Sequence, residues 1–397
     1  MNVFKWTRLV GFIAITSLAT ACGSDDTTDP VDNPGETGGE TGGGSTDTTN
    51  PNDSVVELLP SQVATLTQSV AGPFTFTVPE NAVSVTISIN GPTEGYVTLA
   101  DWTDSTGFEL VEAGWTNQDP TLCLSCNNRI ASAEGAFAAI APNNPSSQLT
   151  PGDHTFSVYG FKLEGGLFSQ ELLPLDGTVE IRVQAKVLPE VPETGILDLN
   201  LHFTGAQGLT AETAQTDSSF QATLDTVREI YAQVGIEIGE LTYIDAPSEF
   251  QVIENVLGGD SDLMALFATS GSQSNQALNV FFVDELKNGD FAFGVILGIA
   301  GGIPGPPLWQ GTPKSGVAIA IKPVQGAPAQ VETTVAHEVG HFLGLFHTSE
   351  QSFTGIHDPL PDTPNNDASY LMFNTGEGNR LSPWQGRVMR SNPWVRH

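Results

Sequence analysis

The sequence predicts two folded domains, an all-β sandwich followed by an α+β domain, behind an export signal and a tether. Short stretches between residues 55 and 190 alternate between apolar and polar side chains and are separated by Gly, Pro and Asn turns, as is typical of a β-sandwich. From residue 195 onward, strand-like and helix-like patterns follow one another, and histidines recur at helical spacing within 337–347. A chain of 397 residues has room for both domains.

Residues 1–22 have the organisation of an export signal. Lys5 and Arg8 precede the apolar run 9–19, which is too short to span a bilayer. Residues 18–22 resemble a bacterial lipoprotein processing site, where cleavage before Cys22 would leave a lipid-modified cysteine. This resemblance implies an outer-membrane or cell-surface lipoprotein of a Gram-negative bacterium, retained or released, whose membrane contact is the lipid on Cys22. An ordinary signal peptide with an incidental cysteine is the alternative.

Residues 23–54 predict a disordered tether, because Gly, Thr, Asp, Pro and Glu dominate and little apolar surface is available to offset chain entropy. The whole chain carries 46 acidic against 14 basic residues and a formal net charge of −32. Such a surface repels phosphate backbones, so the composition argues against nucleic acid as a partner.

Residues 55–190 form the predicted β-sandwich, and the proline-bearing stretch 188–194 marks its end. Its alternating strands are expected at 74–78, 83–89, 154–159 and 179–187. The sequence leaves two roles open for this domain. It could bind a carbohydrate or a protein, or it could stabilise and space the domain that follows.

Residues 195–397 form the predicted α+β domain. Its strands are expected at 196–203, 236–238, 241–244 and 278–283, and an amphipathic helix is expected at 220–234. A Gly/Pro-rich loop is predicted at 298–307 and a further strand at 316–321. A closing helix is predicted to begin at Pro383, with Ser382 as its cap.

Residues 337–347 read HEVGHFLGLFH, which is the pattern HExxHxxGxxH. On a helix, His337 and His341 project from one face and can bind one metal ion. Gly344 falls where the helix should stop and is predicted to adopt φ > 0, so that the chain doubles back and His347 becomes a third ligand. Three neutral imidazoles leave one position of a tetrahedral Zn²⁺ open, which is the catalytic arrangement.

Glu338 is the predicted general base, because it lies beside His337 and can reach a water on the metal. The opposite side of the helix carries an apolar stripe that predicts burial, at Val331, Val335, Val339 and Leu343. HExxH alone arises by chance on surface helices, but the added glycine and third histidine make the full pattern much more specific.

With these residues the sequence resembles the metzincin zinc endopeptidases, most of all their pappalysin-type branch. Thr348, the stretch 362–364 and the stretch 369–373 around Met372 add to the resemblance, and Met372 is the candidate for the methionine turn beneath the metal. The resemblance implies a twisted mixed sheet with an active-site helix, one catalytic Zn²⁺, and protein or peptide substrates. It also implies that strand 316–321 is the sheet edge to which an extended peptide adds, whereas an ordinary buried strand is the alternative.

Cys123 and Cys126 are predicted to form a small loop disulfide, because export places them in an oxidising compartment and no second pair is present for a structural zinc. By the metzincin resemblance, either cysteine could instead hold the metal in a latent state if its domain docks over the cleft. Asp358, Asp362 and Asp367 lie in a predicted loop and could bind Ca²⁺, but they lack EF-hand spacing, and a solvated loop is the alternative that this spacing favours.

The sequence therefore predicts a zinc endopeptidase with His337, His341 and His347 as ligands and Glu338 as base. Two alternative hypotheses stay open. The chain could be a surface lipoprotein that binds a ligand or partner through its β-sandwich while a protease-like domain no longer cuts. It could also be a zinc hydrolase that acts on a bond other than a peptide bond.

Overall fold

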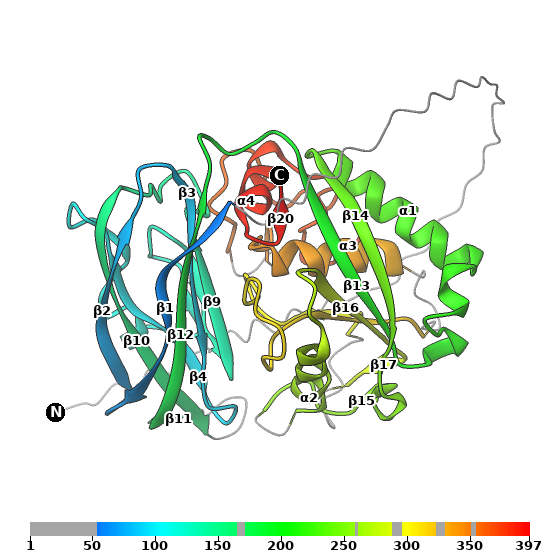
Figure 1. The fold of residues 1–397 in the computed structure, drawn as a ribbon, viewed down its shortest axis with the longest axis horizontal. Helices are drawn as coiled ribbons and strands as arrows, with labels where there is room; N and C mark the ends of the chain where they lie inside the picture. Colours follow the sequence, from blue (N-terminus) through cyan, green and yellow to red (C-terminus); the bar gives the residue numbers. More distant parts are fainter. Residues whose placement is uncertain (1–53, 165–170, 259–260, 288–295, 323–329, 351–354) are drawn as a thin grey trace.

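The computed structural model describes residues 54–397, apart from 165–170, 259–260, 288–295, 323–329 and 351–354. The predictions on the export signal, on Cys22 and on the tether up to residue 53 lie outside the described residues. The described chain is mostly β with few helices, and its elements fall into two groups that lie side by side (Figure 1). None of its helices is long and apolar enough to cross a membrane.

The first group consists of two antiparallel sheets and a short ribbon. One sheet has the order β1 (Val55–Leu66), β12 (Gly177–Val187), β3 (Ala82–Asn90) and β9 (Ala136–Ala141). The other has the order β11 (Glu171–Pro174), β10 (Gly152–Glu164), β4 (Tyr96–Thr103) and β5 (Glu109–Val111), with β2 (Val70–Val78) paired to β10 and β8 (Ala133–Glu134) paired to β4. The ribbon pairs β6 (Leu122–Cys123) with β7 (Ile130–Ala131).

One hydrophobic core joins the two sheets, because alternate side chains of each strand point inward. Phe156 and Val158 of β10 meet Ile181 and Val183 of β12 in this core, together with the fully buried Trp102. The four strands predicted from alternation coincide with β2, β3, β10 and β12. Period-two patterning therefore located four strands of this core but missed β4 and β9, which also contribute to it.

The second group is built on a mixed sheet. Its order is β14 (Ile236–Asp245), β13 (Gly195–Phe203), β16 (Leu278–Val283), β19 (Val317–Ala320) and β18 (Gly298–Ala300), with β20 (Val395–Arg396) paired to β13. The strands β13, β14, β16 and β19 run parallel, while β18 and β20 are antiparallel to their partners. A small parallel pair joins β15 (Val252–Ile253) to β17 (Glu285–Leu286).

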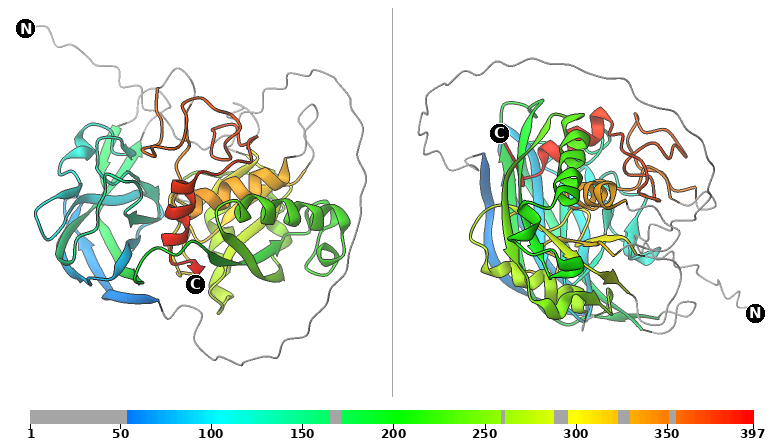
Figure 2. Two further views of the ribbon diagram at one scale, coloured as in Figure 1. Left: turned by 90° about the horizontal axis from the view of Figure 1, so that it is seen from above. Right: turned by 90° about the vertical axis from the view of Figure 1, so that its right-hand side faces the viewer.

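Helices cover both faces of this sheet. The helices α1 (Ser218–Ala232) and α3 (Val331–Phe342) lie side by side on one face, and α4 (Pro383–Ser391) closes the domain beside them (Figure 2). The short helix α2 (Asp262–Ala268) covers the other face, where Phe267 packs on Phe281 of β16 while Phe282 points into the core beneath α1. Single 3-10 turns lie at Trp115–Asn117, Ala206–Gly208, Thr213–Gln215, Ser248–Phe250 and Thr269–Ser272.

The helix ends follow local rules. Asp217 caps α1 by accepting a hydrogen bond from the Phe220 amide, and Ser382 with Gln385 forms a capping box at the start of α4. The buried Tyr231 of α1 donates its hydroxyl to the Ala336 carbonyl of α3 across 2.9 Å. This bond fixes α3, which carries the histidine motif, against α1.

Of the two alternatives for the stretch 316–321, the ordinary buried strand is the one observed. The strand is not the edge that the metzincin resemblance implied, because β19 lies between β16 and β18 and pairs with both. The edge is β18, which is the start of the stretch 298–307 that we predicted to be loop throughout. An apolar run reads the same in an edge and in an inner strand, so only the tertiary arrangement distinguishes them. The pattern analysis also missed α2, which is only two turns long.

Hydrogen bonds and a cation–π contact join the two groups of elements. Lys186 of β12 is fully buried, and its ammonium donates to the carbonyls of Arg390 at 2.7 Å and Asn392 at 3.0 Å, and also to that of Val395. The Arg182 guanidinium lies 3.8 Å from the ring centroid of Trp309. Because a buried ammonium needs its acceptors, these contacts hold the C-terminal segment in one position against β12.

His202 on β13 belongs to a buried polar network within the mixed sheet. Its Nε2 lies 3.0 Å from Asn279 Oδ1, and its ring stacks on Phe281 at 4.2 Å between centroids. Burial lowers the pKa of His202 to about 4. The native structure therefore favours the neutral imidazole.

This pKa shift predicts an acid-sensitive fold. Between pH 6.5 and 4 the unfolded chain binds a proton at residue 202 that the native chain does not, so the free energy of unfolding falls as pH falls. From pH 7 to pH 5 we expect His202 to account for about 2 kcal/mol of that fall. Urea titrations at the two pH values should show a smaller loss in His202→Gln than in the wild type. Equal losses in both proteins would contradict the assignment.

Candidate metal centre

The helix α3 brings His337 and His341 to the same side, one turn apart, and a sharp turn then returns the chain toward them. The Gly344 amide donates to the His341 carbonyl at 2.8 Å, and the Leu345 amide donates to the Gly340 carbonyl at 3.0 Å. This is the Schellman pattern that ends helices at glycine, and Gly344 has the positive φ of 112° that it requires. His347 follows directly, at 5% exposure.

The three imidazoles converge through their Nε2 atoms. His337 Nε2 lies 3.2 Å from His347 Nε2 and 3.0 Å from His341 Nε2. A tetrahedral zinc with Zn–N bonds of about 2.0–2.1 Å holds its ligand nitrogens about 3.3 Å apart. These two separations are close to what one such ion demands, and the ligand atoms of all three histidines lie within 4.8 Å of one another, so the residues fit the metal.

Each imidazole is fixed by an acceptor at its other nitrogen. His337 Nδ1 donates to the Leu371 carbonyl at 2.7 Å, and His341 Nδ1 donates to the Leu345 carbonyl at 2.6 Å. His347 Nδ1 donates to the Glu350 carboxylate at 2.9 Å. Since carbonyls and carboxylates only accept, each Nδ1 carries the proton and each Nε2 presents a lone pair.

Burial keeps the two helix histidines neutral. It lowers the pKa of His337 to about 3 and that of His341 well below the ordinary imidazole value, and the neighbouring histidines add to both shifts. Neutral imidazole is the form that binds metal. Protons therefore compete only weakly with a metal ion for the lone pairs of His337 and His341.

Glu338 lies beside the histidines and is completely buried. Among the described residues its carboxylate oxygens accept no hydrogen bond of normal length and angle. Burial raises its pKa to about 8, and the backbone of Ala300 nearby offsets only part of this rise. An unpaired buried carboxylate is costly and needs a functional explanation. A water or substrate group in the site would supply the missing partner.

The edge strand β18 leaves room for Glu338 because residue 298 is glycine. A Cβ at Gly298 would lie 2.5 Å from Glu338 Cγ and 2.8 Å from Thr334 Cγ2. A similar relation exists beneath the histidines, where a Cβ at Gly340 would lie 2.8 Å from Met372 Sδ. Met372 is fully buried, and its sulfur packs against the turn of α3 that carries Gly340, between the two helix histidines in sequence.

Sequence reasoning missed several members of the site. Glu350 is an acid three residues after a histidine, which is a usable signal for a group that orients a metal ligand. Gly298 and the Leu371 carbonyl gave no sequence signal, because their roles depend on the packing of β18 and of the turn at Met372 against α3. Two cysteines of the other sheet group, Cys123 and Cys126, are joined by a disulfide, so neither offers a thiolate to the histidines.

The acidic residues proposed for Ca²⁺ do not gather into a site. Within the described ranges, the group of three His, Cys, Asp or Glu side chains placed to share an ion is the histidine set. Asp358 is buried, and its Oδ1 accepts from the Thr363 hydroxyl and the Leu360 amide. Burial raises its pKa to about 7, which suits a partly protonated structural carboxyl.

Comparisons with known proteins point to metalloproteases. No protein-family model matches the chain. It is 34% identical over 88 residues to extracellular metalloprotease 1 of Coccidioides posadasii, which covers 22% of this chain and 31% of that protein. It is 27% identical over 152 residues to the extracellular metalloprotease of Colletotrichum graminicola, which covers 38% of this chain and 50% of that protein. The chain thus spans half or less of the length of these relatives.

Among solved structures, the chain is similar to metalloproteinase-II from Bacteroides fragilis. The identity is 14%, and the match covers 47% of this chain and 54% of that one. The TM-score is 0.28, so this likeness carries no argument about the fold.

The Glu350 contact predicts an effect on metal affinity. Glu350→Ala removes the acceptor that orients His347, so we expect zinc affinity to fall by about 10- to 100-fold. Competition with a chromophoric chelator measures the change directly. Glu332→Ala, on the first turn of α3 and away from the imidazoles, is the matched control and should bind zinc like the wild type. Equal affinity in both variants would exclude an orienting role for Glu350.

Proposed function

We propose that the protein is an exported zinc endopeptidase that hydrolyses peptide bonds in proteins. The observation that carries the proposal is the convergence of three Nε2 lone pairs beside the unpaired, fully buried carboxylate of Glu338. The names of the two extracellular metalloproteases to which the chain is similar support the same activity. The HExxHxxGxxH motif and the position of Met372 support a metzincin-type domain of the pappalysin-like branch.

His337, His341 and His347 would hold the metal, and Glu338 would move the proton. When bound, Zn²⁺ supplies a Lewis acid with one position left open, and its charge lowers the pKa of Glu338 below the value in the metal-free chain. Glu338 accepts the proton of the attacking water and passes it to the leaving amine. Burial raises the pKa of Glu338 and the metal charge would lower it, so the two opposing effects would bring it to a range in which the carboxyl can take and give a proton.

The edge strand β18 supports a peptide as the substrate. Gly298 of β18 lies next to Glu338, and β18 has no further strand partner within the described part of the sheet. An extended peptide that pairs with this edge would pass the carboxylate with its backbone in a fixed register. Backbone pairing recognises peptides in general, which favours an endopeptidase over a hydrolase of small esters.

The organisation predicted from sequence forms part of the proposal. Residues 55–190 would be a β-sandwich module and residues 195–397 the catalytic domain. The export signal at 1–22 and a lipid on Cys22 would place the enzyme at the outer membrane or cell surface. Palmitate labelling of wild type and Cys22→Ser in a Gram-negative host tests the anchor separately from the chemistry.

Replacing the base should separate chemistry from metal binding. We expect Glu338→Gln to lower kcat/KM on an unfolded protein substrate by about 10²- to 10⁴-fold, because the amide cannot accept the proton. Zinc content, measured by atomic emission, should stay at one ion per chain. His341→Ala should instead lose both zinc and activity. Cleavage by Glu338→Gln at the wild-type rate would contradict the mechanism.

Metal removal should be reversible. Dialysis against 1,10-phenanthroline is expected to abolish casein cleavage, and stoichiometric Zn²⁺ should restore it, because the histidines are held by protein acceptors in the absence of the ion. A zinc-loaded protein that cleaves neither casein nor a peptide library would support the hypothesis of a ligand-binding lipoprotein with a non-cutting domain.

A further inference from the structure

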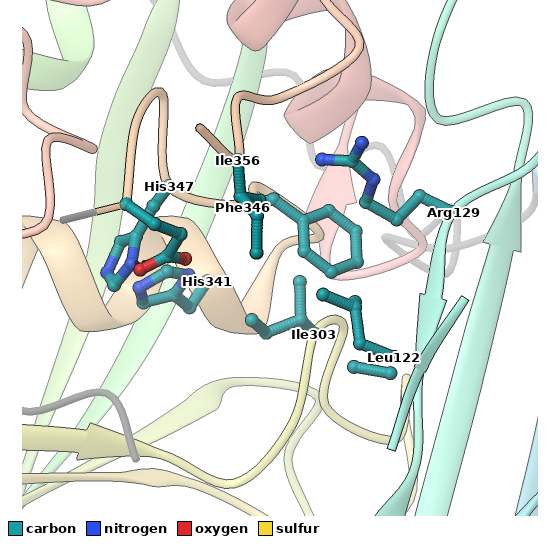
Figure 3. Close-up of a pocket in the computed structure, with 9 residues that line it drawn as sticks. Leu122, Arg129, Ile303, His341, Phe346, His347 and Ile356 are labelled. Atoms are coloured by element: carbon teal, nitrogen blue, oxygen red, sulfur yellow. Dashed lines mark hydrogen bonds and ion pairs between the residues drawn. The ribbon is translucent and has the colours of Figure 1, made fainter. Parts of the chain in front are cut away.

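The β6–β7 ribbon belongs to the first group of sheets, yet it lies against the metal centre. Leu122 pairs with Ala131, and Cys123 pairs with Ile130. The disulfide between Cys123 and Cys126 closes the ribbon near its tip. Figure 3 shows Leu122 and Arg129 of this ribbon facing Phe346 and Ile356 across a small space beside the histidines.

This space is a pocket that both groups of elements build. The first group contributes Leu122, Arg129 and Ala131, and the second contributes Ile303, His341, Phe346, His347, Glu350 and Ile356. Two of the lining residues are proposed metal ligands, so any side chain in the pocket lies next to the reacting bond. Most of the remaining wall is apolar, which favours an apolar occupant.

The charged residues of the pocket are already engaged. Arg129 donates to the His357 carbonyl at 2.7 Å, and its guanidinium carbon lies 5.7 Å from the Phe346 ring centroid. The Glu350 carboxylate accepts from His347. Glu350 and Asp358 also interact electrostatically with Arg129, so the guanidinium faces two carboxyl groups. Arg129 thus anchors the ribbon to the loop after the third histidine and is less available to recognise a charged substrate.

The pocket is small. Its cavity volume is about 20 Å³. About 10–15 Å³ on this measure holds one water, so a methyl or isopropyl group fits better than a larger side chain. Leu122 is 7% exposed and comes from a ribbon held by a disulfide, so it cannot readily move aside.

We propose that the β6–β7 ribbon is a specificity-determining wall of the active site, and that Leu122 restricts the residue beside the cleaved bond to small apolar side chains such as alanine and valine. This inference rests on the proposed peptidase function and deepens it. It gives the first group of sheets a part in substrate selection, in addition to any role in stability or spacing. Leu122→Ala removes an isopropyl group from the wall and should admit larger side chains.

A gain of activity gives the sharpest test. The full chain, wild type and Leu122→Ala, is assayed with zinc on quenched fluorogenic peptides in which each residue flanking the cleaved bond is Ala, Val, Leu or Phe in turn. Wild type should prefer Ala and Val at one flanking position. In Leu122→Ala the ratio of kcat/KM for Leu or Phe over Ala at that position should rise about 10-fold or more. An unstable variant cannot produce such a gain.

Controls separate the possible causes. Leu172→Ala, an exposed leucine on β11 of the same group, should leave the ratio unchanged. Leu122→Phe should narrow the preference further toward Ala, and it keeps the proposal testable if Leu122→Ala does not fold. Zinc content should equal that of wild type in all variants. An unchanged ratio in both Leu122 variants, with zinc bound, would overturn the proposal.

The same assay distinguishes failure of the peptidase function itself. A zinc-loaded wild type that cleaves no peptide of the set refutes the proposed function, whereas cleavage without any dependence on Leu122 refutes only the pocket assignment. A second check uses Cys123→Ser with Cys126→Ser. If the disulfide holds the wall, this pair of changes should relax the Ala and Val preference at unchanged zinc content, and a retained preference would remove the disulfide from the argument.

Discussion

The site depends on the way in which three imidazoles are fixed by their Nδ1 atoms. A carbonyl from the turn at Leu371, a carbonyl from the helix end at Leu345 and the carboxylate of Glu350 each accept a hydrogen bond from one Nδ1–H group. Three lone pairs must then face one another in a buried space, which is unfavourable unless a cation lies between them. The fold keeps these lone pairs close together in its interior. The hydrogen bonds at Nδ1 prevent the rings from rotating to move the lone pairs apart. Metal binding and the stability of this region are therefore coupled.

Much of this arrangement follows from local rules that a sequence displays. Helical spacing placed His337 and His341 on one face, and glycine at 344 indicated the helix end that returns His347. Ser382 and Pro383 identified the start of α4, and strict alternation located β2, β3, β10 and β12. In each case the determining interaction spans a few residues along the chain, so periodicity and capping suffice to predict it.

The remainder depends on contacts between distant segments, which local patterns do not encode. The stretches 298–300 and 316–321 are both short and apolar or glycine-rich, so the pattern could not reveal that the former is the edge strand. Leu122 reads as an ordinary strand residue, although the docking of the two sheet groups places it beside His341. The same docking buries Lys186 against three carbonyls from the last helix, the residue after it and the following strand. In the contacts of Leu122 and of Lys186, the two residues are separated by about half the chain or more, and only the tertiary structure brings them together.

The location of the β6–β7 ribbon has an evolutionary consequence. The histidine helix tolerates little change, because its residues are fixed on every side by the metal site and the core. The loop between β6 and β7 lies on the other sheet group and carries no such burden. Apart from Cys126, which forms the disulfide, and Arg129, which anchors the ribbon, its positions can vary. Under the proposed function, duplicated copies of such a gene would diverge in the proteins that they cleave through changes in this loop, without changes at the histidines or at Glu338.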